Sequence, residues 1–197
     1  MAYHLLIQPF DSEFDFLEDI GKQAKTVYKP KIGTFEVLPK VKLPDSTLTL
    51  WDYTDKFFLE NLVSKLEGSA PKRIMKHHGA GEKMVYVNDI FEEMKSHWAY
   101  NSKEIFLGVL PYFIFGLTDT PNGEADADLN MAIVSNYGIE FRPRVSIGVG
   151  VHEIGHNIGL GHCKNKGCLM KTPGNFEDFY DGVYSLCEKH KKKLAKV

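Results

Sequence analysis

Short apolar runs and amphipathic segments alternate along the first two-thirds of the chain. Apolar runs predict strands over 4–8, 34–38, 83–87, 104–110, 112–117 and 131–135. Apolar residues at helical spacing predict helices over 12–26, from 54 or 55 to 66, and from 88 to about 98. Ser12, Thr54 or Asp55, and Asn88 are the expected N-caps. This alternation predicts an α/β fold with a mixed, twisted sheet packed on helices.

The pattern changes beyond residue 117. Residues 118–129 are mostly polar and are expected to form a loop. A helix is expected after Pro143, and turns followed by one C-terminal helix over 183–196 are expected after residue 165. A chain of 197 residues suits one compact domain. We therefore expect a single domain over 1–197, with a sheet-containing part at 1–143 and a helical part at 144–197.

Composition and charge are those of an ordinary globular protein. Hydrophobic residues make up 43%, charged residues 25%, and the formal net charge is −2, which gives no electrostatic footprint for nucleic acid or anionic membrane. The N-terminus lacks the basic leading region of a signal peptide, and no apolar stretch is long enough to cross a bilayer. We expect a cytoplasmic monomer without a nucleic-acid or membrane partner.

The most informative motif is H-E-x-x-H-x-x-G-x-x-H, which begins at His152. His152 and His156 are at i and i+4, so one helix face can place both imidazoles on a metal. Gly159 can adopt the left-handed conformation that ends a helix, and the resulting turn carries His162 to the third ligand position. Three nitrogens leave the fourth position of a tetrahedral zinc site to water. Glu153 is not a ligand but is close enough to accept a proton from that water.

Chance is the competing explanation for this motif. A bare H-E-x-x-H recurs by accident, but five fixed positions, with glycine where the helix must end, are far more specific. Zinc held there would lower the pKa of its water to about 7 and polarise a carbonyl. The sequence therefore predicts a metal-dependent hydrolase with Glu153 as its general base.

The cysteines point to a second metal. The chain has three, Cys163, Cys168 and Cys187, and all lie in its last fifth. An odd number is a poor disulfide framework, and clustered thiols in a cytosolic protein indicate metal binding.

The histidine motif and the cysteines together resemble the metzincins, and within them the archaemetzincin (archaelysin) family. In that family the motif runs into a cysteine, followed by C-x4-C-x-M and a later C-x-x-C. Here Cys163 follows His162, four residues separate it from Cys168, and Met170 stands one residue later. The resemblance covers 148–190. Upstream, 123–125 and 131–135 resemble the family's loop and edge strand.

The resemblance implies peptidase or aminopeptidase activity, an active-site helix at the floor of a cleft, and a second, structural zinc. Met170 would form the methionine turn, an apolar floor under the imidazoles. The family's fourth cysteine is replaced by His190. Because imidazole is an ordinary zinc ligand, Cys163, Cys168, Cys187 and His190 form a plausible structural site. The alternative is a surface histidine, with water or another group completing the zinc shell.

The predicted function is hydrolysis of peptide bonds in a peptide or protein, with two zinc ions per chain. Residues 131–135 are expected to pair with an extended substrate by strand addition. The alternative is a non-enzymatic zinc protein that binds a protein or nucleic acid through its cysteine cluster and lysine-rich tail. The acidic net charge and the intact Glu153 argue against that alternative.

Overall fold

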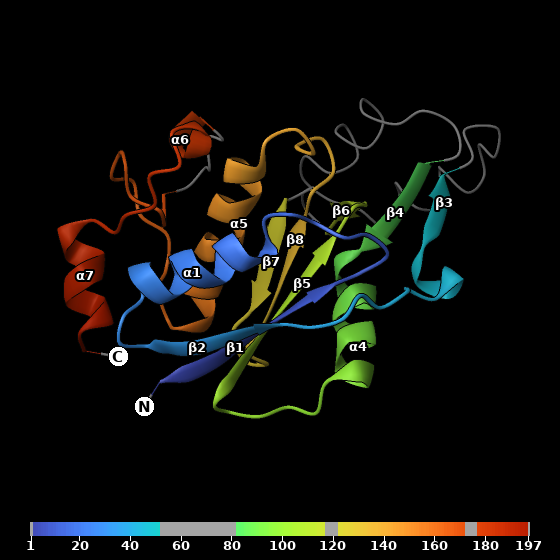
Figure 1. The fold of residues 1–197 in the computed structure, drawn as a ribbon, viewed down its shortest axis with the longest axis horizontal. Helices are drawn as coiled ribbons and strands as arrows, with labels where there is room; N and C mark the ends of the chain where they lie inside the picture. Colours follow the sequence, from blue (N-terminus) through green and yellow to red (C-terminus); the bar gives the residue numbers. More distant parts are fainter. Residues whose placement is uncertain (1, 52–81, 117–121, 172–176, 197) are drawn as a thin grey trace.

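The computed structural model describes residues 2–51, 82–116, 122–171 and 177–196, and a mixed five-stranded sheet runs through them in the order β2-β1-β5-β8-β7 (Figure 1). Its strands are β1 (Tyr3–Pro9), β2 (Ile32–Val37), β5 (Glu104–Leu110), β7 (Gly123–Asp126) and β8 (Met131–Ser135). Strand β7 runs antiparallel to β8, and the other pairings are parallel. A three-stranded sheet, in the order β3-β4-β6, contains β3 (Thr49–Trp51), β4 (Glu82–Tyr86) and β6 (Phe113–Phe115).

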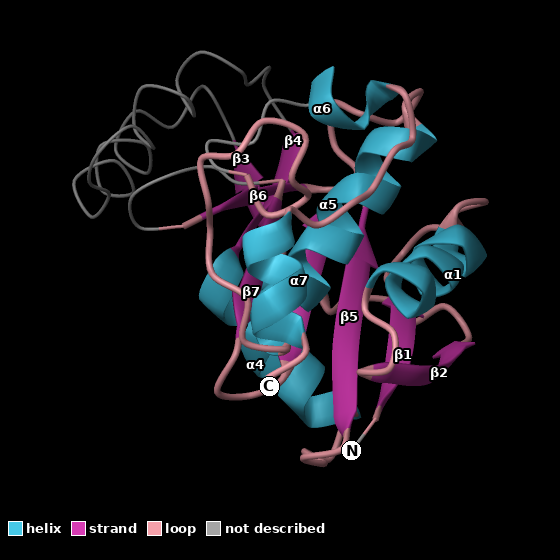
Figure 2. Cartoon of the chain, turned by 90° about the vertical axis from the view of Figure 1, so that its left-hand side faces the viewer, coloured by secondary structure: helices cyan, strands magenta, loops and turns pink. Residues whose placement is uncertain are grey.

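Helices cover both faces of the larger sheet. They are α1 (Leu17–Val27), α4 (Val87–His97), α5 (Pro143–Asn157), α6 (Glu177–Tyr180) and α7 (Glu188–Leu194), with a 3-10 turn at Asp45–Thr47. Successive residues of a strand point to opposite faces. In β5, Ile105 and Leu107 therefore pack in one core with α1 and α5, whereas Phe106 and Leu110 pack in a second core with α4. Figure 2 shows α1 and α4 on opposite sides of the strands.

Helix α5 is buried along most of its length. It begins with Pro143 at its first turn, where a missing backbone N–H costs nothing. It contacts α1, β7 and β8, and the C-terminal segment folds back beside it (Figure 1). The helix thus lies between the sheet and the C-terminal part, which fixes its position along both sides.

All six predicted strands are confirmed. The strands expected at 4–8, 34–38, 83–87, 104–110 and 131–135 form with ends that agree to within two residues. The strand expected at 112–117 forms as β6, Phe113–Phe115, and residue 117 lies outside the described residues. The described residues make one domain with a mixed sheet packed on helices, as predicted. No helix in the described ranges is long and apolar enough to span a membrane. The helix expected between residues 54 and 66 lies outside the described residues.

The first helix starts later than expected. It begins at Leu17, and Ser12 does not cap it. Asp11 has a φ of 55°, and the Ser12 N–H donates to the Phe10 carbonyl over 2.6 Å. This tight turn directs the chain away from β1 before a helix can form.

Strand β7 was not foreseen, because its residues lie inside the expected polar loop. All four are half-buried, so its sequence has no alternation of apolar and polar side chains. Two helix boundaries also differ. Helix α4 begins at Val87, with Asn88 inside it donating to the Tyr86 hydroxyl over 3.2 Å. Helix α7 is confined to 188–194, with Cys187 at its N-cap.

Candidate metal centres and active site

The three motif histidines converge at the C-terminal end of α5. His152 and His156 lie on successive turns of the helix, which ends at Asn157. Gly159 has a φ of +86°, which confirms the predicted left-handed turn. Beyond this turn the chain folds back, so that the imidazole of His162 lies beside that of His156. The Nε2 atom of His156 lies 3.1 Å from Nε2 of His152 and 3.1 Å from Nε2 of His162.

Backbone carbonyls fix the proton positions on two of these rings. Nδ1 of His152 lies 2.7 Å from the Leu169 carbonyl oxygen, and Nδ1 of His156 lies 2.9 Å from that of Leu160. A carbonyl only accepts, so each Nδ1 carries the proton and each Nε2 presents a lone pair. Two lone pairs that face each other need a cation between them. Zinc at about 2.0–2.1 Å in a tetrahedral site would hold its nitrogen ligands roughly 3.3 Å apart, so these residues fit zinc.

Burial keeps the imidazoles of His152 and His156 in the form that binds metal. Desolvation lowers the pKa of His152. Desolvation, together with the neighbouring His152 and His162, lowers the pKa of His156 to about 4. Metal ligation requires neutral imidazole, so no proton has to be displaced from Nε2 near neutral pH.

The Glu153 carboxylate lies between α5 and the edge strand β7. Glu153 is buried, and a Cβ atom added at Gly123 would lie 2.7 Å from its Cγ and 2.8 Å from its Oε1. Glycine at 123 is therefore required for the carboxylate to occupy this position. Burial raises the pKa of Glu153 well above its ordinary value, and the charge of Glu124 raises it further. The motif identified Glu153, but it gave no indication of the role of Gly123.

A second cluster lies beside the first. It contains Cys163, Cys168, Cys187 and His190, whose ligand atoms all lie within 4.8 Å of one another. Nδ1 of His190 is 3.3 Å from Sγ of Cys168 and 3.7 Å from Sγ of Cys187. Zinc distances of about 2.3 Å to sulfur and about 2.0–2.1 Å to nitrogen would separate such atoms by roughly 3.5 Å, so this cluster also fits zinc.

His190 is only 2% exposed, so the alternative of a surface histidine is wrong. Burial lowers the pKa of His190, and the nearby Gly161 backbone raises it. Gly161 directly precedes His162, so His190 lies beside the loop that carries the third histidine.

The expected edge strand is a different one. Residues 131–135 form β8, which is hydrogen-bonded to β5 on one side and to β7 on the other. A central strand has no free edge with which to pair a peptide, so that expectation is wrong. Strand β7 occupies the edge of the described sheet, next to Glu153.

Known proteins similar in sequence to this chain include archaemetzincins. The model of Peptidase family M54 matches residues 129–196. An archaemetzincin of Methanocaldococcus jannaschii is 24% identical over 198 residues, covering 98% of this chain and 94% of that protein.

Two solved structures have the same fold over nearly the whole chain. The archaemetzincin of Archaeoglobus fulgidus, crystallised with malonate, aligns with a TM-score of 0.61 at 19% identity, covering 96% of this chain and 99% of that one. That of Methanopyrus kandleri aligns with a TM-score of 0.58 at 15% identity, covering 99% of this chain and 94% of that one. The motif, the fold and these relatives agree: the chain is similar to the archaemetzincins over nearly its whole length and is a zinc metallopeptidase.

Proposed function

We propose that His152, His156 and His162 hold a catalytic zinc and that Glu153 is the general base in peptide-bond hydrolysis. The observation that carries this proposal is the convergence of three Nε2 atoms beside a buried carboxylate. When bound, zinc would lower the pKa of a coordinated water to about 7 and polarise the scissile carbonyl.

The chain's own groups orient the ligands and move the proton. The bonds from His152 and His156 to the backbone hold the two rings in place. Glu153 would accept a proton from the attacking water and pass it to the leaving amine. Gly123 leaves the space that keeps this carboxylate against β7.

We propose a second, structural zinc held by Cys163, Cys168, Cys187 and His190, giving two zinc ions per chain. Four protein donors close a tetrahedral site and leave no position for a substrate. His190 lies beside Gly161, on the loop that presents His162. In this proposal the second metal stabilises the ligand geometry of the first.

The substrate is a peptide or protein, and we propose that it extends along the outer edge of β7. An added strand takes its affinity from main-chain hydrogen bonds, and its scissile bond would pass the Glu153 carboxylate. Glu124 is close enough for its charge to raise the pKa of Glu153, so two carboxylates border this position. A substrate's terminal ammonium group would complement them, which favours aminopeptidase action.

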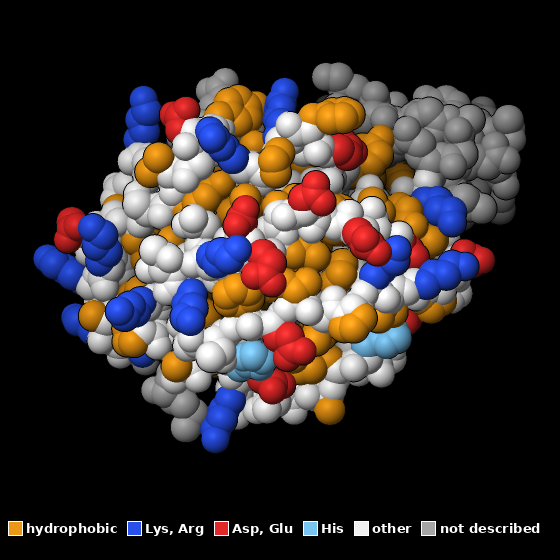
Figure 3. All heavy atoms as spheres, viewed as in Figure 1, with side chains coloured by type: hydrophobic (Ala, Val, Ile, Leu, Met, Phe, Trp, Pro, Cys, Tyr) orange, Lys and Arg blue, Asp and Glu red, His pale blue; other side chains and the backbone are white. Residues whose placement is uncertain are grey.

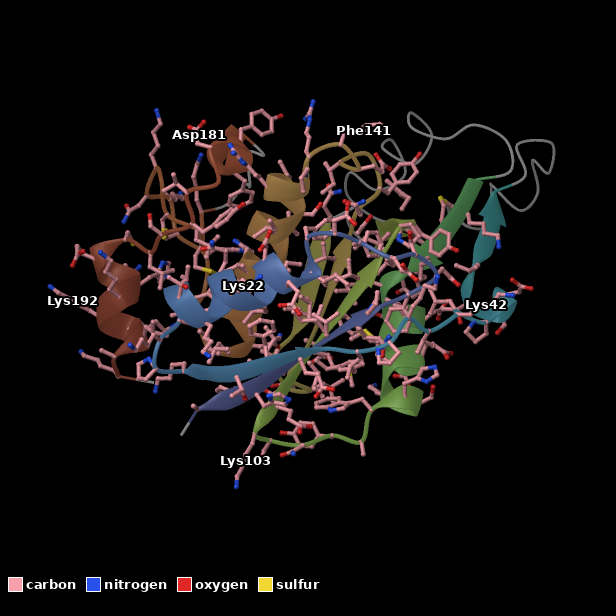
Figure 4. The ribbon with its side chains drawn as sticks, in the orientation of Figure 1. Lys22, Lys42, Lys103, Phe141, Asp181 and Lys192 are labelled. Atoms are coloured by element: carbon pink, nitrogen blue, oxygen red, sulfur yellow. The ribbon has the colours of Figure 1, made fainter. Side chains whose placement is uncertain are left out.

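The charge distribution supports a peptidase over a nucleic-acid-binding zinc protein. On the face shown in Figure 3, Lys and Arg side chains are interspersed with Asp and Glu. In the lysine-rich α7, Lys191 pairs with Glu188 over 2.8 Å, and Lys192 points away from the molecule (Figure 4). The other lysines of α7, Lys189 and Lys193, are exposed as well.

A paired hydrolysis assay tests the proposed function. One reporter is an aminoacyl fluorophore, and the other is an internally quenched peptide with an acetylated N-terminus. We expect a metal chelator to abolish hydrolysis and added zinc to restore it, with the aminoacyl reporter cleaved faster. Cleavage of the acetylated peptide alone would reject aminopeptidase action. Chelator-resistant cleavage, or none of either substrate, would reject the zinc mechanism.

A further inference from the structure

Tyr28 is buried against the active-site helix on the side of α1. Its side chain is 0% exposed, and its hydroxyl donates to the Val151 carbonyl over 2.6 Å. Val151 directly precedes His152. A backbone carbonyl has two lone pairs, so it can accept this bond in addition to the helical bond from the Gly155 N–H.

Gly155 makes this close approach possible. A Cβ atom at that position would lie 2.5 Å from the Tyr28 hydroxyl and 2.5 Å from Sδ of Met170. The hydroxyl and this sulfur are themselves 3.7 Å apart. The tyrosine, the methionine turn and the helix backbone therefore meet at one point, between the turns that carry His152 and His156.

The contacts of Tyr28 support His152 in two ways, through the helix backbone and through the methionine turn. Leu169, the residue before Met170, provides the carbonyl that accepts the His152 Nδ1–H over 2.7 Å. Tyr28 thus contacts the residue before His152 and the residue after its hydrogen-bond partner. We infer that Tyr28 is a positioning residue, whose hydroxyl fixes the helix backbone and the methionine turn so that the His152 imidazole stays directed at the metal. This inference rests on the proposed role of His152.

A buried tyrosine that only stabilises the core is the alternative, and the chain offers a matched control for it. The Tyr184 hydroxyl donates to the Arg144 carbonyl, also over 2.6 Å and also on α5, but near the start of the helix. Tyr28→Phe and Tyr184→Phe each remove one hydroxyl and keep the ring. Their comparison separates an effect at the metal from a general loss of helix support.

The experiment follows zinc transfer from the zinc-loaded protein to a chromophoric chelator. Zinc that the parent releases and a His156→Ala variant does not release is assigned to the histidine site. We expect Tyr28→Phe to release this fraction about 10-fold to 100-fold faster, as is typical when a group that supports a ligand is lost. Its kcat should fall with KM nearly unchanged, and Tyr184→Phe should release zinc at the parent rate even if it melts earlier.

Gly155→Ala is the second variant, and it also serves if Tyr28→Phe does not fold. It displaces the hydroxyl and the sulfur without removing either, so it should accelerate zinc release as well. Release at the parent rate in Tyr28→Phe, or equal acceleration in both phenylalanine variants, would overturn the inference. Zinc release needs no turnover. An inactive parent whose Tyr28→Phe variant still loses zinc faster would therefore reject the peptidase function alone.

Discussion

The histidine cluster and the cysteine cluster differ in composition, exposure and span. Three imidazoles form the first, and two of them lie on a single helix, while His162 is exposed. The second has four donors, and Cys163, Cys168 and His190 are all buried. A three-donor group with an exposed side suits a metal that must accept a substrate, whereas a closed four-donor group suits a metal that holds the chain together. We therefore propose a catalytic role for the histidine cluster and a structural role for the cysteine cluster. The two clusters share the loop that follows Gly161.

The largest effect on activity is expected from a change beside the histidine cluster that leaves the metal of that cluster bound. Glu153→Gln keeps the volume of the side chain and all three imidazoles but removes the proton acceptor. We expect kcat to fall by about 10²–10⁴-fold, the usual contribution of general acid–base catalysis, with zinc content unchanged. Steady-state kinetics and metal analysis of the same sample provide the check. A variant that retains parent activity would show that another group takes the proton.

A smaller loss is expected when the carboxylate is displaced. Gly123→Ala places a Cβ 2.8 Å from Oε1 of Glu153, so the carboxylate must move. Displacement of a reacting group by about 1 Å can cost about 10²-fold in rate. The control is Gly33→Ala on β2, at the opposite edge of the sheet, where the new Cβ would lie 3.1 Å from the Ala2 Cβ and 3.7 Å from the Tyr3 carbonyl oxygen. If both alanine variants hydrolyse substrate equally well, β7 does not constrain Glu153.

The smallest effect on activity is expected from a change in the cysteine cluster. His190→Ala leaves three thiols without their fourth partner and removes the ring that lies beside Gly161. We expect weaker retention of the second zinc, a loss of about 1–3 kcal/mol in unfolding free energy from the unpaired buried groups, and a partial loss of activity through a looser His162.

His190→Cys should restore zinc retention, because it provides a fourth thiolate. Thermal unfolding and metal analysis of both variants check this comparison. Two zinc ions retained as tightly as in the parent, with an unchanged melting temperature, would show that His190 is not a ligand.

Local spacing made the histidine cluster predictable. His152, His156 and the turn at Gly159 lie within a few residues of one another, so helix geometry alone places them together. The side chains that support the cluster come from distant parts of the chain, where spacing carries no information. Tyr28 lies 123 residues before its acceptor, Val151.

Strand β7 escaped prediction for a different reason. An edge strand that is half-buried on both faces has no alternating apolar pattern. The need for glycine at 123 depends on the side chain of a helix residue that follows much later in the chain. Continuous apolar runs identified β5 and β8, whose side chains fill the two cores, because burial on both faces produces such a run.

Metal analysis of His156→Ala tests the central claim, that the two clusters are separate metal centres and that the histidine cluster is the catalytic one. His156 is the middle of the three histidines, with its Nε2 3.1 Å from those of both others. We expect the zinc content to fall from two ions per chain to one, hydrolysis to be lost, and the circular dichroism spectrum to stay that of the folded parent. Loss of both ions together with the fold, or retention of two ions with full activity, would contradict the account.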